Sequence, residues 1–223
     1  MNKKYIAQDP LDNIFSEEGG IFEGTLIMCA GQPGVGKTTL MLNYLSKINK
    51  NPDTKVVYVS SEMSQLDNEH IYNYNEDIKN IKTIYLTKDC LVELKSAIDY
   101  NDVIFIDSIN SIVEKIAYFH DMSHQKAEQV VLNFLENNQK NKTIIFSQKI
   151  NKDGSFKGSS HFGHLTTTNI MLTHEEPYRK ISVVKNRRGS NKELFFKIEK
   201  GEIKYNKEIP IDDKLKKIHE NLI

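Results

Sequence analysis

Six short apolar segments, separated by helical or polar stretches, are the feature that most limits how this chain can fold. They are rich in isoleucine and valine and nearly continuous rather than alternating, and they lie at residues 25–30, 55–60, 81–87, 102–107, 142–148 and 168–173. Continuous apolar strands are typical of a parallel sheet that is covered on both faces. Helical patterns lie between them at residues 37–49, 90–99 and 123–139. This alternation predicts βαβ units in a doubly wound α/β sheet.

The chain changes character after residue 176. The segments RKISVVKN, LFFKIEK and EIKY, with a turn at Lys200-Gly201, predict an antiparallel extension of the sheet. The tail has Leu215, Ile218 and Leu222 at helical spacing, which predicts a helix that packs on its own domain or on a partner.

We expect three parts in this chain of 223 residues: an N-terminal segment at 1–15, a core at 16–207 and a C-terminal helix at 208–223. The first segment has few apolar residues, and its sequence fits folding on its own subunit as well as docking on a neighbour. Docking of that kind would help to build an oligomer.

Composition excludes several classes of protein. The formal net charge is zero, so nucleic acid binding would need a local basic patch rather than a basic surface overall. Cys29 and Cys90 are far apart and form no CxxC pattern, which argues against zinc and disulfides and for a reducing compartment. The first residues contain no apolar run, so we expect no signal peptide, and no apolar stretch reaches membrane-spanning length. We expect a cytoplasmic protein with no membrane partner.

The segment GQPGVGKT at 31–38, here called the phosphate loop, follows a predicted strand and opens a predicted helix. In this context its backbone N–H groups can surround phosphate oxygens, and the helix N-terminus adds a positive dipole. Lys37 would reach the β- and γ-phosphates of ATP, and the Thr38 hydroxyl would ligate Mg²⁺. The alternative is a glycine-rich turn without a ligand. The predicted nucleotide-binding residues are Gly31, Gly34, Val35, Gly36, Lys37, Thr38 and Thr39.

Three further strands end in polar residues suited to phosphate chemistry. Asp107 can hold the Mg²⁺ shell through water, although an aspartate in this place can also cap a helix. Glu62 can polarise the attacking water, or it is a solvated loop carboxylate. Gln148 can sense the γ-phosphate, or it is an ordinary polar strand end. Together with Lys37, these residues predict an ATP hydrolase.

These motifs resemble those of the RecA-like ATPases, and among them the bacterial RadA (Sms) recombination proteins. The resemblance covers about residues 10 to 200 and rests on GGIFEGTLIMCAGQPGVGKTTL, VVYVSSEMS, DVIFIDSIN, NKDGSFKGSSHFGHL and SVVKNRRG. The segment VVYVSSEMS is equally similar to DnaB-type replicative helicases. The last segment is close to the Lys-Asn-Arg-Phe-Gly signature of RadA. The resemblance implies a RecA-like P-loop fold and an ATPase of recombination or repair.

The chain departs from RadA at several points. Arg188 stands at the signature phenylalanine and Gln148 at the usual histidine. With two cysteines and 223 residues, we expect neither the zinc module nor the protease-like domain of RadA. The chain is similar to a minimal RecA core of the kind that phages and mobile elements carry.

The resemblance implies that the loops after the Asp107 and Gln148 strands, at 112–124 and 149–163, face DNA. Lysines and aromatic residues in the second loop suit contacts to the backbone and bases of a single strand. A solvated surface loop has a similar composition. His164 either reports the nucleotide state to this loop or is structural. The predicted DNA-binding residues are Lys149, Lys152, Phe156, Lys157, Phe162 and Arg188.

Arginine is rare in this chain, and two of its three arginines lie in KNRRG at 185–189; the third is Arg179. The resemblance implies that Lys185 and Arg187 act in trans, on the γ-phosphate held by a neighbouring subunit of a hexameric ring or filament. A guanidinium stabilises the charge that develops in phosphoryl transfer.

The leading hypothesis is therefore an oligomeric, DNA-dependent ATPase that acts on single-stranded DNA in recombination, with a branch-migration, mediator or annealing role. A DnaB-like helicase motor is the alternative in the same class, although the extra N-terminal domain of such helicases is not expected here. A KaiC-like signalling ATPase without a DNA role is the alternative of another class.

Overall fold

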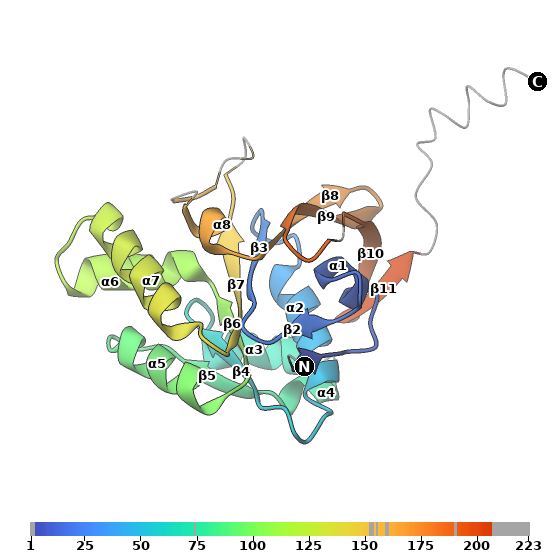
Figure 1. Cartoon of the computed structure of the whole chain (residues 1–223), viewed down its shortest axis with the longest axis horizontal. Coiled ribbons are helices and arrows are strands. Elements are labelled where there is room, and N and C mark those ends of the chain that lie inside the picture. Colours follow the sequence, from blue (N-terminus) through green and yellow to red (C-terminus); the bar gives the residue numbers. More distant parts are fainter. Residues whose placement is uncertain are drawn as a thin grey trace, which may run out of the picture.

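The structure, a computed structural model, describes residues 3–206 apart from residues 74, 152–153, 155, 159–160 and 190. Its main element is a mixed sheet with helices on both faces (Figure 1). Among the described residues the strand order is β11-β10-β9-β8-β3-β7-β6-β4-β5. The six predicted strands are confirmed as β3 (Leu26–Gly31), β4 (Val56–Ser60), β5 (Lys82–Tyr85), β6 (Val103–Asp107), β7 (Thr143–Lys149) and β8 (Thr168–Glu175).

Strand β3, which leads into the phosphate loop, lies between two parallel neighbours. Its last residue, Gly31, pairs with Lys149 of β7 on one side and with Leu172 of β8 on the other. The carboxyl ends of β3, β7, β6 and β4 therefore meet at one edge of the sheet, where ligands bind in open α/β folds.

The antiparallel extension is also confirmed. It consists of β9 (Tyr178–Asn186), β10 (Glu193–Glu199) and β11 (Glu202–Asn206), each antiparallel to the strand before it. Lys200 and Gly201 have φ angles of 48° and 75° and form the two-residue turn between β10 and β11. Positive φ at both positions is what such a hairpin turn requires.

Three helices follow the predicted periodicity: α2 (Lys37–Ile48), α5 (Cys90–Tyr100) and α7 (His124–Asn138). The sequence reasoning did not anticipate the short hairpin β1 (Lys4–Tyr5) with β2 (Ile21–Phe22), or helices α1 (Asp12–Phe15), α3 (Gln65–Tyr72), α4 (Glu76–Lys79), α6 (Ile109–Phe119) and α8 (His161–Leu165). The predicted helix at 208–223 lies outside the described residues.

The segment at 112–124, expected as a DNA-facing loop, is largely helical. Its residues up to Phe119 belong to α6, and α7 begins at His124. Ile109, Ile112, Val113 and Ile116 are all buried, at the spacing of one helical face. This apolar pattern holds the segment on the sheet, so the expectation of an open loop was wrong for most of its length.

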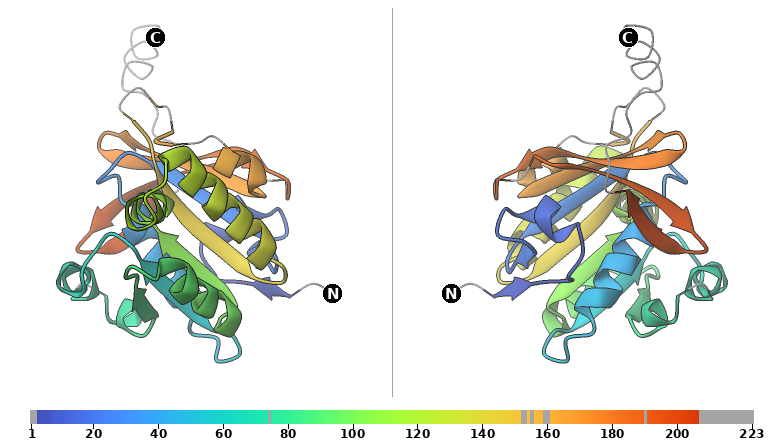
Figure 2. Two further views of the ribbon diagram at one scale, coloured as in Figure 1. Left: turned by 90° about the vertical axis from the view of Figure 1, so that its left-hand side faces the viewer. Right: turned by 90° about the vertical axis from the view of Figure 1, so that its right-hand side faces the viewer.

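Each face of the sheet has its own hydrophobic core. Helices α1, α2 and α4 cover one face, and α5, α6, α7 and α8 cover the other. The two side views in Figure 2 show α7 and α8 in front on the left and α2 on the opposite side on the right. The core beneath α2 is called the α2 core, and the core beneath α7 is called the α7 core. In β7, Ile145 belongs to the α2 core, whereas Ile144 and Phe146 belong to the α7 core. Odd-numbered residues of β7 therefore face α2.

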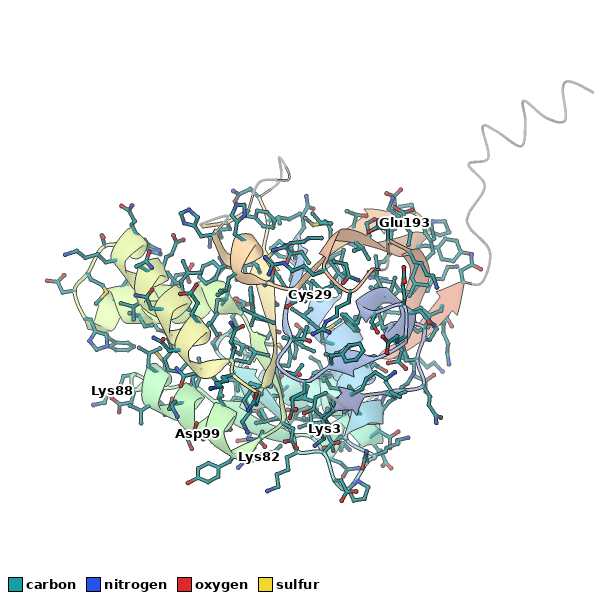
Figure 3. The ribbon with its side chains drawn as sticks, viewed as in Figure 1. Lys3, Cys29, Lys82, Lys88, Asp99 and Glu193 are labelled. Carbon is teal, nitrogen blue, oxygen red and sulfur yellow. The ribbon has the colours of Figure 1, made fainter. Side chains whose placement is uncertain are left out.

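Both cysteines are buried thiols. Figure 3 shows Cys29 deep among packed side chains, and burial raises the pKa of its thiol to about 12. A thiol with such a pKa is protonated and unreactive at neutral pH. In the described part of the chain, no helix is both long and apolar enough to cross a membrane.

The N-terminal segment packs on its own chain. Tyr5, Leu11, Ile14 and Phe15 are buried in the α2 core. Asp12 holds the segment in place, since its carboxylate accepts hydrogen bonds from the backbone N–H of Ala7 and of Asp9.

Two tyrosines extend this anchor to the rest of the fold. Tyr44 of α2 donates to Asp12 at 2.8 Å, and Tyr205 of β11 donates to Asp9 at 2.7 Å. Burial, followed by the charge of Asp12, raises the pKa of Tyr44 well above its ordinary value. Lys47 pairs with Asp9 at 2.5 Å. The segment is therefore tied to both α2 and the last described strand.

We predict that Asp12→Ala lowers the free energy of unfolding by about 2–4 kcal/mol, because three buried donors lose their acceptor. Asp77→Ala is the matched control. Asp77 forms an exposed ion pair with Lys50, so its loss should cost at most about 1 kcal/mol. Urea unfolding of both variants measures the difference. Equal stability losses would show that the Asp12 network does not anchor the segment.

Candidate functional site

The phosphate loop connects β3 to α2 with its glycines in conformations that other residues rarely adopt. Gly34 and Gly36 have φ angles of 78° and 97°. A Cβ on Gly36 would also lie 2.5 Å from Cδ1 of Ile198. The loop therefore needs glycine at position 36 for its backbone angle, whereas the end of the Ile198 side chain could shift. Helix α2 begins within this segment, at Lys37, so backbone N–H groups and the helix dipole meet at the loop.

Lys37 lies at the base of the loop. Its ammonium donates to the carbonyl oxygens of Gly31 at 2.8 Å and of Gln32 at 3.0 Å. Burial lowers the pKa of Lys37, and the nearby carboxylates of Asp107 and Glu62 act in the opposite direction.

Asp107, at the end of β6, connects the loop to the sheet. Its carboxylate accepts hydrogen bonds from Thr38 of α2 and Ser147 of β7. Burial raises the pKa of Asp107, although the hydrogen bonds from Ser147 and Thr38 oppose the rise. A buried carboxylate beside a threonine hydroxyl is the oxygen donor set that Mg²⁺ prefers. Thr38 and Asp107 therefore fit the predicted metal site.

Glu62, just past β4, is held through one oxygen. Its Oε1 accepts from the Ser108 hydroxyl, from the Ser111 hydroxyl at 2.8 Å, and from the Lys149 ammonium at 2.7 Å. Burial acts to raise the pKa of Glu62, but the bonds from Lys149, Ser108 and Ser111 outweigh it and lower that pKa. Glu62 is therefore a fixed, ionised carboxylate that can accept a proton.

These side chains line one cavity of about 320 Å³. It brings together residues from the phosphate loop, β4, β6 and β7, among them Lys37, Thr38, Glu62, Asp107, Ser147 and Lys149. This set of groups is suited to a nucleoside triphosphate with Mg²⁺, because it combines loop glycines, a lysine, a hydroxyl and two carboxylates. Gly34, Gly36 and Thr39 line the same cavity, while Gly31 and Val35 of the loop are buried.

Gln148, the expected sensor, does not line this cavity. It is fully buried, and the alternation of β7 places it on the face of the α7 core. Its neighbours Ser147 and Lys149 face the phosphate loop instead. Lys149 was expected at DNA, but it is an odd-numbered residue of β7 and pairs with Glu62. The structure thus offers Lys149 in place of Gln148 as the group at the end of β7.

The other expected DNA-binding residues do not together form one exposed surface. Phe162 is buried and packs against Phe146 with ring centroids 5.9 Å apart, so its ring is not available for stacking on bases. Phe156 is partly buried against the same core. Lys157 is exposed and pairs with Glu114 at 3.1 Å. Lys152 lies outside the described residues.

Lys185 and Arg187 lie away from the cavity, near α8. Lys185 donates to the carbonyl oxygens of Gly163 at 3.0 Å and His164 at 2.9 Å, and burial and Arg187 lower its pKa. Arg187 is exposed and lines a groove between α7 and α8 together with His161 and His164. No hydrogen bond or ion pair to its guanidinium occurs among the described residues.

Arg188 points to a different neighbour. Its guanidinium lies 4.6 Å from the centre of the Phe22 ring, and its carbonyl accepts from the backbone N–H of Glu17. These contacts tie the end of β9 to the N-terminal part of the chain, although Arg188 stays exposed.

Sequence reasoning missed the site roles of four polar residues: Ser108, Ser111, Ser147 and Lys149. The two serines after Asp107 gave a weak signal, because Ser108 is a typical helix N-cap, and α6 begins directly after it. Nothing in the sequence showed which residue of Ser147, Gln148 and Lys149 faces the loop.

Comparisons with known proteins agree with this geometry. The family model described as "ATPase: KaiC" matches residues 6–83. DNA repair protein RadA of Aquifex aeolicus is 28% identical over 83% of this chain, and RadA of Rickettsia typhi is 30% identical over 79%. The chain spans 42% and 41% of the lengths of those two proteins.

Two solved structures have the same fold. A KaiC-like protein from Pyrococcus horikoshii superposes with a TM-score of 0.72 at 22% identity, over 92% of this chain and 100% of that one. The flagellar accessory protein FlaH from Methanocaldococcus jannaschii gives a TM-score of 0.62 at 18% identity, over 92% and 99%. The chain therefore has a RecA-like α/β fold with a phosphate loop, and it is similar to RadA and to the KaiC-like ATPases.

Proposed function

We propose that this protein hydrolyses ATP as an oligomer and that single-stranded DNA stimulates the hydrolysis, in a recombination or repair role. The observation that carries the hydrolysis is the arrangement of Glu62. Three donors, Ser108, Ser111 and Lys149, fix its Oε1. A carboxylate held in this way can accept a proton from a water molecule that attacks a phosphate.

The roles of the other residues follow from their positions. The loop glycines and Lys37 would bind the phosphates of ATP, while Thr38 and Asp107 would hold Mg²⁺. When bound, Mg²⁺ neutralises charge that develops on the phosphate oxygens. Lys149 holds Glu62 ionised and in place.

The DNA role rests on the similarity to proteins named DNA repair protein RadA. Exposed Lys157 and the loop around it would contact the strand. A KaiC-like ATPase without a DNA role remains the second candidate. It is favoured by the inward positions of Lys149 and Phe162, two residues expected at DNA.

The first test is the rate of ATP hydrolysis with and without a single-stranded oligonucleotide. We expect the DNA to raise the rate of the wild type. Glu62→Gln should bind ATP but hydrolyse it about 10²–10⁴-fold more slowly, because it loses the general base. Glu69→Gln, an exposed carboxylate on α3, is the control and should behave like the wild type. Hydrolysis that is independent of DNA would instead support the second candidate.

The dependence of hydrolysis on pH tests the Lys149–Glu62 pair. A general base works only when ionised, so the rate falls as the pH drops through its pKa. Lys149 lowers the pKa of Glu62, so Lys149→Met should move this acid limb of kcat/KM to higher pH. Lys157→Met removes a nearby cation that pairs with Glu114 instead, and it should leave the limb in place. An unmoved limb in Lys149→Met would contradict the role of Glu62 as base.

Mixing two inactive variants tests the action in trans. Arg187→Ala keeps its own Glu62, and Glu62→Gln keeps its own Arg187. In a mixed oligomer some interfaces join an intact Glu62 to an intact Arg187. We expect each variant alone to lose about 10³-fold in rate and the mixture to regain a measurable part of it. If Arg187 acts within its own subunit, the mixture will be no faster than the sum of the two variants.

A further inference from the structure

The third arginine, Arg179, lies beside the phosphate loop. It is the second residue of β9, and its cross-strand partner in β10 is Phe196, a member of the α2 core. Directly paired residues of antiparallel strands share a face of the sheet, so Arg179 faces the side of α2. A Cβ placed on Gly36 would lie 3.6 Å from Nε of Arg179 and 3.7 Å from its Cδ.

This guanidinium has no partner in the described part of the chain. Nε of Arg179 is buried and makes no hydrogen bond, and no ion pair or hydrogen bond involves the rest of the side chain. The next residue, Lys180, points to the opposite face and pairs with Glu193 at 3.2 Å. A partly buried cation without a counter-charge is costly, and such groups are normally paired. A phosphate of a nucleotide bound at the neighbouring phosphate loop would supply the missing partner.

The sheet order shows which end of the nucleotide Arg179 would face. Glu62, Asp107 and Lys149 belong to β4, β6 and β7 or follow them, on one side of β3. Arg179 belongs to β9, on the other side of β3. The phosphate that is transferred must lie near Glu62. Arg179 therefore faces the part of the nucleotide that is not transferred.

We propose that Arg179 is a nucleotide-binding residue that contacts a non-transferred phosphate of the nucleotide held by its own subunit. This inference rests on the proposed binding of nucleotide at the phosphate loop. It assigns Arg179 and Arg187 different tasks, the first in affinity within one subunit and the second in turnover between subunits. Since ADP keeps the phosphates concerned, Arg179 should contribute equally to the binding of ADP and ATP.

The test is titration with a fluorescent ADP derivative and its displacement by tripolyphosphate, which has no base or ribose. Arg179→Met keeps the apolar stem and removes the charge. We expect it to bind the ADP probe and tripolyphosphate about 10- to 100-fold more weakly, the effect of one hydrogen bond to a charged group. At saturating ATP its kcat should match that of the wild type. Lys180→Met is the matched control and should keep wild-type affinity.

The thermal midpoint without nucleotide separates a binding residue from a structural one. Removal of an unpaired, partly buried charge should leave the midpoint of Arg179→Met equal to or above that of the wild type. A lower midpoint with unchanged ADP affinity would mean that Arg179 supports the fold only. Arg179→Lys keeps a charge but loses the planar fork, so we expect an affinity between those of the wild type and the methionine variant.

Three further results would be decisive. Unchanged affinity of Arg179→Met for ADP overturns the inference, while the proposed hydrolysis stands if the wild type binds the probe. If Arg179→Met binds ADP more weakly but keeps the wild-type affinity for tripolyphosphate, Arg179 contacts the base or ribose, and the phosphate contact is overturned. A wild type that does not bind ADP would overturn the proposed function itself. Loss of DNA stimulation alone would leave the role of Arg179 intact.

Discussion

The central place of β3 in the sheet is the constraint on which the rest of the site depends. Two parallel neighbours fix its carboxyl end, at Gly31, by pairing with Lys149 and Leu172. The phosphate loop that follows can therefore be placed by the backbone alone, before any side chain contributes. Asp107 then joins the loop to β7 through Thr38 and Ser147, so that three elements share one buried carboxylate.

The division of labour around β3 follows from this placement. The strands on one side, β7, β6 and β4, supply the groups suited to bond breaking. On the other side, β8 and β9 belong to the region where the sheet becomes antiparallel, and β9 provides Arg179. The N-terminal segment closes the α2 face through Asp12 and Tyr44, so the same helix takes part in both the site and the anchor.

The strands and the phosphate loop could be predicted because their signals are local: apolar runs, a fixed glycine spacing and a polar residue where each strand ends. Glu62 and Asp107 follow from the same rule. The rule fails for Gln148, because β7 continues to Lys149. Alternate residues of a strand face the same side, so Ser147 and Lys149 face the phosphate loop and Gln148 does not. A shift of one residue in an expected strand end exchanges the two faces. The position of Arg179 beside the phosphate loop depends on the pairing of β9 with β8, which no sequence spacing reveals. The apolar spacing of α6 was present in the sequence but was not used.

Lys185 connects β9 to α8 within the chain, and in the proposed oligomer this contact would have a further consequence. Its ammonium is shared by two carbonyl groups of α8, the short helix that precedes β8. An ammonium has three N–H donors, and a phosphate that draws it away would leave the end of this helix without its restraint. A phosphate that binds Lys185 from outside the subunit would therefore also loosen α8. In the proposed oligomer, binding or hydrolysis of the nucleotide in one subunit would in this way change how firmly α8 is held in the adjacent subunit.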